Sequence, residues 1–299
     1  MSQNVALLRR IPPLHPVAIG VSTRRSKRKV PQMPAPDRDP DILDSDVTAC
    51  AQLVERADPD RFRAAMAAPV AGRSVLFPLY AFNVEVARAP WVTKEPMIAE
   101  MRLQWWRDAL EEIASGGPVR RHEVVTPLAR VLDPDDARRL DALVDARRAD
   151  LESAPFDDRE ALMAYLDATS GGLLWTAARR LGAGPGAEGA VRDAGVALGL
   201  ANWLRAIPAL EAAGKRPVPD GRPQALADLA GEGLTLLSRA RAARATLPRA
   251  AMLPLAAGDT AAVLRRALRN PGAVAAGALE RATPARRATL AWAAATGRW

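Results

Sequence analysis

Apolar residues recur three and four positions apart along most of the chain from residue 41 onward. In the segment 103–110, Leu103, Trp106 and Leu110 fall on one helical face. We expect the two neighbouring tryptophans to pack inside a bundle and Arg107 to pair with a carboxylate. Alternation between apolar and polar positions never lasts long enough to indicate a strand. The pattern therefore predicts an all-α protein, folded as a single large helical bundle.

Proline, glycine and helix-capping aspartates divide this pattern into separate helices. Asp58-Pro59-Asp60 ends one helix and begins the next, because proline suits a first helical turn. Gly116-Gly117-Pro118 and Pro271-Gly272 are further breaks. The expected helices cover about 45–56, 59–68, 73–89, 96–115, 134–152, 158–180, 190–210, 224–245, 259–269 and 284–297.

The net charge of +8 is unevenly distributed along the chain. Residues 1–40 carry a net charge of +6, residues 41–230 carry −6, and residues 231–299 carry +8. No basic stripe with stacking aromatics appears, so no nucleic acid is expected as a partner. Two arginine groups fall on consecutive helices of the last third, Arg239, Arg241 and Arg244, then Arg265, Arg266 and Arg269. They predict contact with an anionic surface, and the alternative is that they are only solvated.

The first 40 residues are expected to be a disordered, basic, proline-rich tail before a helical domain at 41–299. Alternatives are that Met33 is the true first residue, or that the tail anchors the chain to anionic lipid. The longest uncharged run, Ile11 to Thr23, has 13 residues and three prolines. A membrane span needs about 20 apolar residues. No signal peptide or transmembrane segment is therefore expected, and the prediction is a cytoplasmic protein, peripheral to the inner membrane at most.

Few residues suit a metal or nucleophilic centre. One cysteine and two distant histidines exclude a disulfide within the chain and a zinc site. Phosphate-binding glycine loops, nucleophile elbows and dinucleotide fingerprints are absent from the sequence. Asp145, Asp150 and Asp167 are expected to pair with neighbouring arginines such as Arg147 and Arg148.

Five segments together resemble the squalene/phytoene synthase family. They are Leu79 to Arg88, Leu103 to Leu110, Leu143 to Leu151, Tyr165 to Gly172, and Gly195 to Ala206, and the resemblance extends over about residues 41–270. It implies an isoprenoid synthase fold with a central cavity between the helices. The candidate cavity or ligand-binding residues that the resemblance implies are Tyr80, Phe82, Asp150, Tyr165, Asn202 and Arg205.

The chain departs from the family at the acidic residues of both metal-binding motifs. The resemblance places the first set of acids at Ala87, Arg88 and Trp91, and the second at Ala206, Ala209 and Leu210. In the family, such carboxylates hold Mg²⁺ against a prenyl diphosphate, and Mg²⁺ prefers oxygen ligands. Arg88 is expected to place a cation where the metal would sit. No catalytic residue, metal ligand or cofactor is therefore assigned; Mg²⁺ would be needed only by an active prenyl transferase.

The loss of the acids indicates a protein retained for binding. The Tyr80-Ala81-Phe82-Asn83 stretch and the following Arg102-to-Arg107 segment resemble the non-catalytic branch of the family, which includes an assembly factor for respiratory complex I. This resemblance implies an assembly or scaffold factor whose partner is a membrane-complex subunit or the anionic membrane surface. One alternative is an active prenyl transferase with a phytoene- or squalene-like product. The other is a binding protein for a prenyl lipid or quinone.

Overall fold

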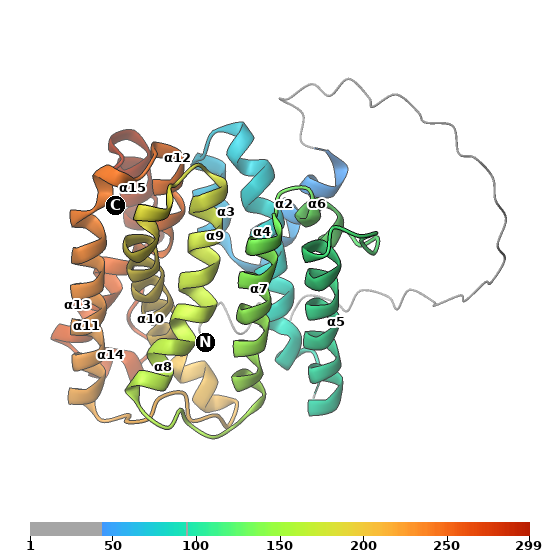
Figure 1. Cartoon of the computed structure of the whole chain (residues 1–299). Coiled ribbons are helices and arrows are strands. Elements are labelled where there is room, and N and C mark those ends of the chain that lie inside the picture. The colour runs from blue at the N-terminus through green and yellow to red at the C-terminus, as the bar shows by residue number, and fades with distance from the viewer. Residues whose placement is uncertain (1–43, 94) are drawn as a thin grey trace, which may run out of the picture.

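The computed structural model describes residues 44–93 and 95–299, and those residues form helices without a β-strand. The helices pack side by side in a layered bundle (Figure 1). Their bounds are α2 (Ser45–Ala57), α3 (Pro59–Ala67), α4 (Val70–Arg88), α5 (Pro96–Ala114), α6 (Val125–Ala129), α7 (Pro134–Ala146), α8 (Arg159–Leu166), α9 (Gly172–Arg180), α10 (Glu188–Ala212), α11 (Pro223–Ala242), α12 (Arg249–Met252), α13 (Thr260–Arg269), α14 (Gly272–Ala275) and α15 (Thr283–Thr296). The expected tail, 1–40, and its boundary with the helical domain lie outside the described residues, so both stay predictions.

Four aspartates begin helices where the sequence predicts them. The Oδ1 atoms of Asp44 and Asp58 accept hydrogen bonds from the backbone N–H groups three residues later, at 2.9 and 3.0 Å. Asp133 and Asp158 do the same at 2.9 and 2.7 Å. Each bond satisfies a donor that the first turn leaves free, which contributes about 1 kcal/mol. Local chemistry thus sets where α2, α3, α7 and α8 start.

Two expected boundaries are wrong. α4 begins at Val70, three residues before the expected Arg73, because Pro69 holds the extended conformation of an N-cap. The helix expected over 134–152 ends at Ala146 and continues as a 3-10 turn, Arg147–Leu151. Residues three apart eclipse in a 3-10 turn, and Arg147 Nη1 accordingly lies 3.0 Å from Asp150 Oδ2. The short helices α6, α12 and α14 have no counterpart in the predicted pattern.

The long helix α10 lies in the interior, between α9 and α11 (Figure 1). It packs closely on the π-helical turn Asp167–Gly171 that joins α8 to α9. A Cβ atom on Gly195 would lie 2.6 Å from Gly171 Cα, and one on Gly199 would lie 2.8 Å from Ser170 Cβ. Only glycine at these positions permits the observed approach. Ser170 Oγ then donates a buried hydrogen bond of 2.7 Å to the Gly195 carbonyl.

The predicted tryptophan pair lies in the core, as expected. The ring centroids of Trp105 and Trp106 are 4.9 Å apart, and Trp106 meets Phe82 edge-on at 5.4 Å. Arg107 Nε donates to Asp141 Oδ1 of α7 at 2.7 Å, so this arginine does pair with a carboxylate. The segment therefore joins α5 to α4 and α7.

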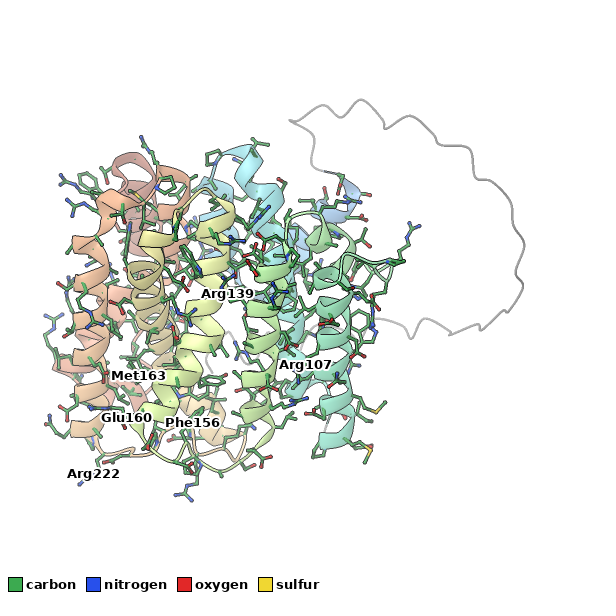
Figure 2. The ribbon with its side chains drawn as sticks, in the orientation of Figure 1. Arg107, Arg139, Phe156, Glu160, Met163 and Arg222 are labelled. Carbon is green, nitrogen blue, oxygen red and sulfur yellow. The ribbon has the colours of Figure 1, made fainter. Side chains whose placement is uncertain are left out.

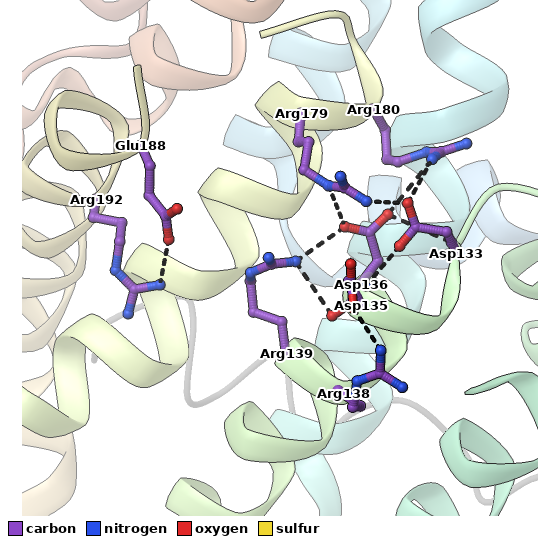
Figure 3. Close-up of polar contacts among 9 residues, drawn as sticks. All are labelled: Asp133, Asp135, Asp136, Arg138, Arg139, Arg179, Arg180, Glu188 and Arg192. Carbon is purple, nitrogen blue, oxygen red and sulfur yellow. Dashed lines mark hydrogen bonds and ion pairs between the residues drawn. The ribbon is translucent and has the colours of Figure 1, made fainter. Parts of the chain in front are cut away.

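Arginines of α9 hold a buried carboxylate of α7 (Figure 3). The Asp136 side chain is 0% exposed. Its Oδ1 accepts hydrogen bonds of 3.0 Å from both Arg139 Nη1 and Arg179 Nε, and Asp133 also pairs with Arg179 and Arg180. In this cluster (Asp133, Asp136, Arg139, Arg179 and Arg180), each carboxylate is engaged by at least two guanidinium groups. The cluster therefore ties two helices together and leaves no carboxylate oxygen for a ligand.

Over the described ranges 44–93 and 95–299, no helix is long and apolar enough to cross a membrane.

Candidate functional site

A cavity of about 210 Å³ lies between α4, the π-helical turn and α10. The junction of α2 with α3, the turn after α4 and the 3-10 turn Arg147–Leu151 complete its wall. Its lining consists of Ala57, Asp58, Arg61, Asn83, Val84, Ala87, Trp91, Arg147, Asp150, Tyr165, Leu166, Thr169, Ser170, Gly199, Asn202, Trp203, Ala206 and Leu210. Segments more than a hundred residues apart in sequence thus meet around one space.

Three of the six candidate residues line this cavity, namely Asp150, Tyr165 and Asn202. Tyr165 is 5% exposed, and its hydroxyl donates to Asp150 Oδ1 at 2.7 Å. Arg147 Nη1 donates to the same hydroxyl at 2.7 Å. Burial raises the pKa of the Tyr165 phenol well above its ordinary value, and the nearby Asp150 carboxylate raises it further. Tyr165 therefore stays a neutral hydrogen-bonding group at the cavity wall.

The other three candidates lie elsewhere. Tyr80 and Phe82 are buried and do not line the cavity. Successive helix positions turn by about 100°, so Phe82 lies on a different face of α4 from Asn83, Val84 and Ala87, whereas Tyr80 shares their face one turn earlier. Phe82 packs on Trp106, whereas Tyr80 lies under Arg61, whose guanidinium carbon is 5.6 Å from the ring centroid.

Arg205 lines an adjacent polar pocket of about 20 Å³, which it shares with Asp58, Asp60 and Asn202. Its Nη2 donates to Asn202 Oδ1, and its Nη1 lies 3.8 Å from Asp60 Oδ2. Burial lowers the pKa of the Arg205 guanidinium. Arg205 thus acts on the cavity through Asn202, whose amide it holds in place.

Apolar side chains occupy the wall at most of the positions where the family resemblance places acids. Ala87, Trp91, Ala206 and Leu210 all line the cavity. Arg88 does not, which contradicts the expectation that it puts a cation at the metal position. Arg88 is buried beside the cavity wall and its Nη1 bonds Glu85 Oε1 at 2.8 Å. Burial raises the pKa of that Glu85 carboxyl although Arg88 opposes the shift.

The charged groups of the lining compensate one another. Asp58 Oδ2 lies 2.7 Å from Arg61 Nη1, and Asp150 Oδ2 lies 3.0 Å from Arg147 Nη1. Asp145 and Asp167, outside the lining, also pair as expected, with Arg148 and with Arg192. Two cations and two anions face the cavity, so it carries no surplus charge of either sign.

This donor set does not fit a magnesium ion that bridges a diphosphate. Mg²⁺ requires near-octahedral oxygen ligation with carboxylates free to bind it. Both carboxylates of the lining, Asp58 and Asp150, are already engaged by guanidinium groups. Among residues 44–93 and 95–299, no three His, Cys, Asp or Glu side chains are grouped so as to hold a metal. No step through a metal is therefore assigned to this site.

Aromatic side chains crowd one end of the cavity. Trp203 packs on Tyr165 with ring centroids 5.3 Å apart, and Phe156 lies 5.1 Å from Tyr165. Trp203 Nε1 donates to the Pro217 carbonyl at 2.7 Å, which fixes its indole. Figure 2 labels Phe156 at the lower end of the bundle, in the connection before α8. A small space of about 30 Å³ beyond these rings shares Trp91, Asp150 and Trp203 with the cavity. Apolar rings and a hydrogen-bonding wall thus meet at this end.

Sequence reasoning missed several lining residues. Asp58 and Arg61 were predicted only as part of a helix start, although they bring one of the two ion pairs to the cavity. Arg147 was expected to pair with a carboxylate but was not predicted to line the cavity. Its spacing of three residues from Asp150 is the sequence feature that could have placed it there. Thr169 and Ser170 line the wall through the π-helical turn. Regular helical spacing does not reveal such positions.

Comparisons with known proteins agree with this architecture. A model of squalene/phytoene synthase matches residues 54–222. NADH dehydrogenase (ubiquinone) complex I, assembly factor 6, of Homo sapiens is 29% identical over 161 residues, which are 53% of this chain and 48% of that protein. The Drosophila melanogaster homolog of assembly factor 6 is 32% identical over 178 residues, which are 57% and 52% of the two chains. The chain therefore spans about half the length of the curated relatives it matches.

Two solved structures share the fold. A dehydrosqualene synthase in complex with ligand superposes with a TM-score of 0.69 at 16% identity, covering 83% of this chain and 94% of that one. A squalene synthase from Alicyclobacillus acidocaldarius superposes with a TM-score of 0.61 at 17% identity, covering 75% and 94%. The expected all-α isoprenoid synthase fold is thereby confirmed. Since the family model matches more than half of the chain, this protein belongs to the squalene/phytoene synthase family.

Proposed function

We propose that this chain is a non-catalytic member of its family and acts as an assembly or scaffold factor for a respiratory membrane complex of the complex I type. The observation that carries the proposal is the wall of Ala87, Trp91, Ala206 and Leu210, where the family resemblance places metal-binding acids. Relatives named for complex I assembly support the choice of partner. The partner is a subunit of such a complex or the anionic membrane surface beside it. The protein works in the cytoplasm, at the inner membrane.

The physical reason against prenyl transfer is electrostatic. Ionisation of a prenyl diphosphate leaves several negative charges on the leaving group, and the enzyme must neutralise them. Here the two guanidinium groups of the cavity, Arg61 and Arg147, already neutralise Asp58 and Asp150. The lining therefore has no unpaired guanidinium group to bind a diphosphate. It also has no unpaired carboxylate to bind the Mg²⁺ that neutralises a diphosphate in the family.

A genetic experiment tests the assembly role. A host strain without this chain should lose most of its assembled NADH dehydrogenase, measured as the intact complex on native gels and as NADH:quinone activity of its membranes. The intact gene should restore both. Unchanged levels of the complex in the deletion strain would overturn the proposal.

A second experiment tests the absence of catalysis. Purified protein, incubated with farnesyl or geranylgeranyl diphosphate and Mg²⁺ or Mn²⁺, should form no condensation product and release no pyrophosphate. Metal-dependent pyrophosphate release that is lost in Asp150→Asn would show an active prenyl transferase instead.

The charge balance of the cavity favours a second candidate function, the binding of an uncharged lipid such as a prenyl alcohol or quinone. Ser170 and Asn202 place neutral polar groups in the wall, while Trp91 and Leu210 offer apolar surface. Pockets with a few polar groups in an apolar wall suit such ligands. Tryptophan fluorescence should report binding of farnesol that is as tight as that of farnesyl diphosphate and independent of Mg²⁺.

A matched pair of variants localises this binding. Ala206→Phe fills the cavity and should abolish the fluorescence response. Ala212→Phe adds the same ring at an exposed position near the end of the same helix and should leave the response intact. Equal responses of the two variants, or a clear preference for the diphosphate with Mg²⁺, would exclude a neutral ligand in this cavity.

A further inference from the structure

We propose that the outward face of α13 binds anionic phospholipid headgroups and holds the protein against a membrane surface. This face consists of Arg265, Arg266, Leu268 and Arg269, and we call it the α13 arginine face. The inference deepens the proposed function and rests on it for the biological setting, because it names the surface through which a membrane-associated factor would attach.

The helix α13 separates its residues sharply into two sides. Val263, Leu264 and Ala267 are buried against the neighbouring helices, chiefly α11. Arg265 and Arg266 are exposed in the middle of the helix, and Arg269 is its last residue. Figure 1 shows α11 and α13 together at the left edge of the bundle. The arginines therefore face solvent from a convex helical surface.

These three arginines have no partner carboxylate within the described ranges. No Asp or Glu oxygen of residues 44–93 or 95–299 lies within 4.0 Å of their guanidinium nitrogens. α13 itself contains no acidic residue. Within residues 44–93 and 95–299, the side-chain hydrogen bond of this group runs within the helix, from Arg269 Nε to the Arg265 carbonyl at 3.3 Å. Three positive charges thus stand within two turns without internal compensation.

Unlike the arginines of α13, Arg239 and Arg241 of α11 have partners within the protein. The anionic-surface site that the sequence predicts is therefore smaller than expected. Arg239 is bound by Asp193, with Nε 3.0 Å from Oδ2. Arg241 is half-buried and packs on the Trp299 ring at 5.9 Å from the centroid. Arg239 is therefore paired at the surface, and Arg241 is engaged by an aromatic ring. The basic surface of the last third is reduced to α13 and the exposed arginines near it.

The shape and chemistry of this face favour lipid headgroups. Guanidinium groups form paired hydrogen bonds with phosphate oxygens, and a row of them suits a flat anionic surface. Leu268 lies beside them and is 41% exposed, so an apolar side chain can enter the interface between headgroups and acyl chains. An anionic bilayer satisfies all four residues together.

Vesicle co-sedimentation of the full-length chain tests the inference. One set of vesicles contains phosphatidylcholine alone, and the other also contains phosphatidylglycerol. We expect binding to the anionic vesicles only, and its decrease at high salt, because exposed charges are screened within about 10 Å at 0.1 M salt. The triple variant Arg265→Glu/Arg266→Glu/Arg269→Glu should weaken binding roughly 100-fold, since each basic residue near an anionic surface contributes about a factor of five to the affinity and the three factors multiply.

A charge-matched variant provides the control. Arg138, Arg159 and Arg222 have side chains that are 62, 54 and 83% exposed, and each already lies beside a carboxylate. Figure 2 labels Arg222 at the lower corner of the bundle, before α11 begins. Arg138→Glu/Arg159→Glu/Arg222→Glu changes the net charge as much as the α13 variant does, yet it should keep most of the binding. Circular dichroism and thermal unfolding check that both variants are folded.

The outcomes separate the possibilities. Loss of binding in the α13 variant alone supports the inference. Equal binding of the two variants overturns it, because the basic segment 1–40 or net charge would then explain attachment. Binding to phosphatidylcholine, or to neither vesicle, also overturns it. Because the vesicles contain no respiratory complex, a negative result here leaves the assembly role standing, and a negative result in the deletion strain leaves the lipid-binding face standing.

Discussion

The contact between α10 and the π-helical turn makes a quantitative prediction about glycine. Gly195 and Gly189 both lie in α10, and alanine favours a helix over glycine by about 0.5–1 kcal/mol. At Gly189 an added Cβ would meet no atom within 4 Å. At Gly195 it would lie 2.6 Å from Gly171 Cα and 3.0 Å from both Gly171 N and the Ser170 carbonyl oxygen. Those three atoms belong to the backbone, so no rotamer change relieves the overlap.

The magnitudes follow from these contacts. Overpacking of a tight interface costs about 1–3 kcal/mol, and separation of the helices would also strain the Ser170–Gly195 hydrogen bond. After the gain in helix propensity, Gly195→Ala should lower the free energy of unfolding by about 1–2 kcal/mol. Gly189→Ala lies in the first turn, so it should leave that free energy unchanged or raise it by about 0.5 kcal/mol.

Urea unfolding followed by circular dichroism at one protein concentration measures both variants against the parent chain. The urea concentration at the transition midpoint should be lower for Gly195→Ala than for the parent chain and should be unchanged or slightly higher for Gly189→Ala. The dependence of the free energy of unfolding on urea concentration should be the same for all three proteins. A Gly195→Ala midpoint equal to or above that of Gly189→Ala would refute the close approach of α10 to the π-helical turn.

Three further predictions concern buried polar groups. Tyr165→Phe removes the hydroxyl that bonds both Arg147 and Asp150 at 2.7 Å. It should lower the free energy of unfolding by about 1–3 kcal/mol in the same urea assay. An unchanged free energy of unfolding would show that these two hydrogen bonds are absent. Burial holds the pKa of His122 below its ordinary value, so the unfolded chain takes up the proton first as the pH falls from about 6.5. Stability should therefore decline on acidification in that window, by at most about 1.4 kcal/mol per pH unit for this group, and His122→Asn should decline less. Burial raises the pKa of the Cys50 thiol to about 12, so this single cysteine should resist a thiol-reactive disulfide reagent at pH 8 in the native protein and react fully in urea.

Sequence reasoning located most helices because their starts depend on local chemistry. Four helices are capped by an aspartate that accepts a hydrogen bond from the backbone N–H three residues later, namely Asp44, Asp58, Asp133 and Asp158. Such local capping can be predicted from the order of residues. The short helices α6, α12 and α14 lack a side-chain cap and are too short to show a period. Their conformation depends on packing, so the sequence alone does not reveal them.

The site was harder to predict than the fold, and Arg88 illustrates the reason. The resemblance to the family places Ala87 and Arg88 at consecutive positions where the family has metal-binding acids. On a helix they point about 100° apart, so Ala87 lines the cavity and Arg88 turns to Glu85. Asp58 and Arg61 reach the same cavity from a segment with no motif. The match of a residue to a family motif predicts the helix in which it lies. The direction of its side chain depends on how that helix is rotated against its neighbours.

The charge-balanced cavity also bears on how this lineage can change. A magnesium site of the family type would need acids at positions such as Ala87 and Ala206, acquired one mutation at a time. The first such carboxylate would enter a wall where every cation is already paired, and an unpaired charge in a partly buried site is strongly destabilising. Each intermediate would therefore lose stability before it gained a metal. The arrangement of ion pairs therefore makes a metal site at these positions difficult to gain by single mutations, whatever function now selects the protein.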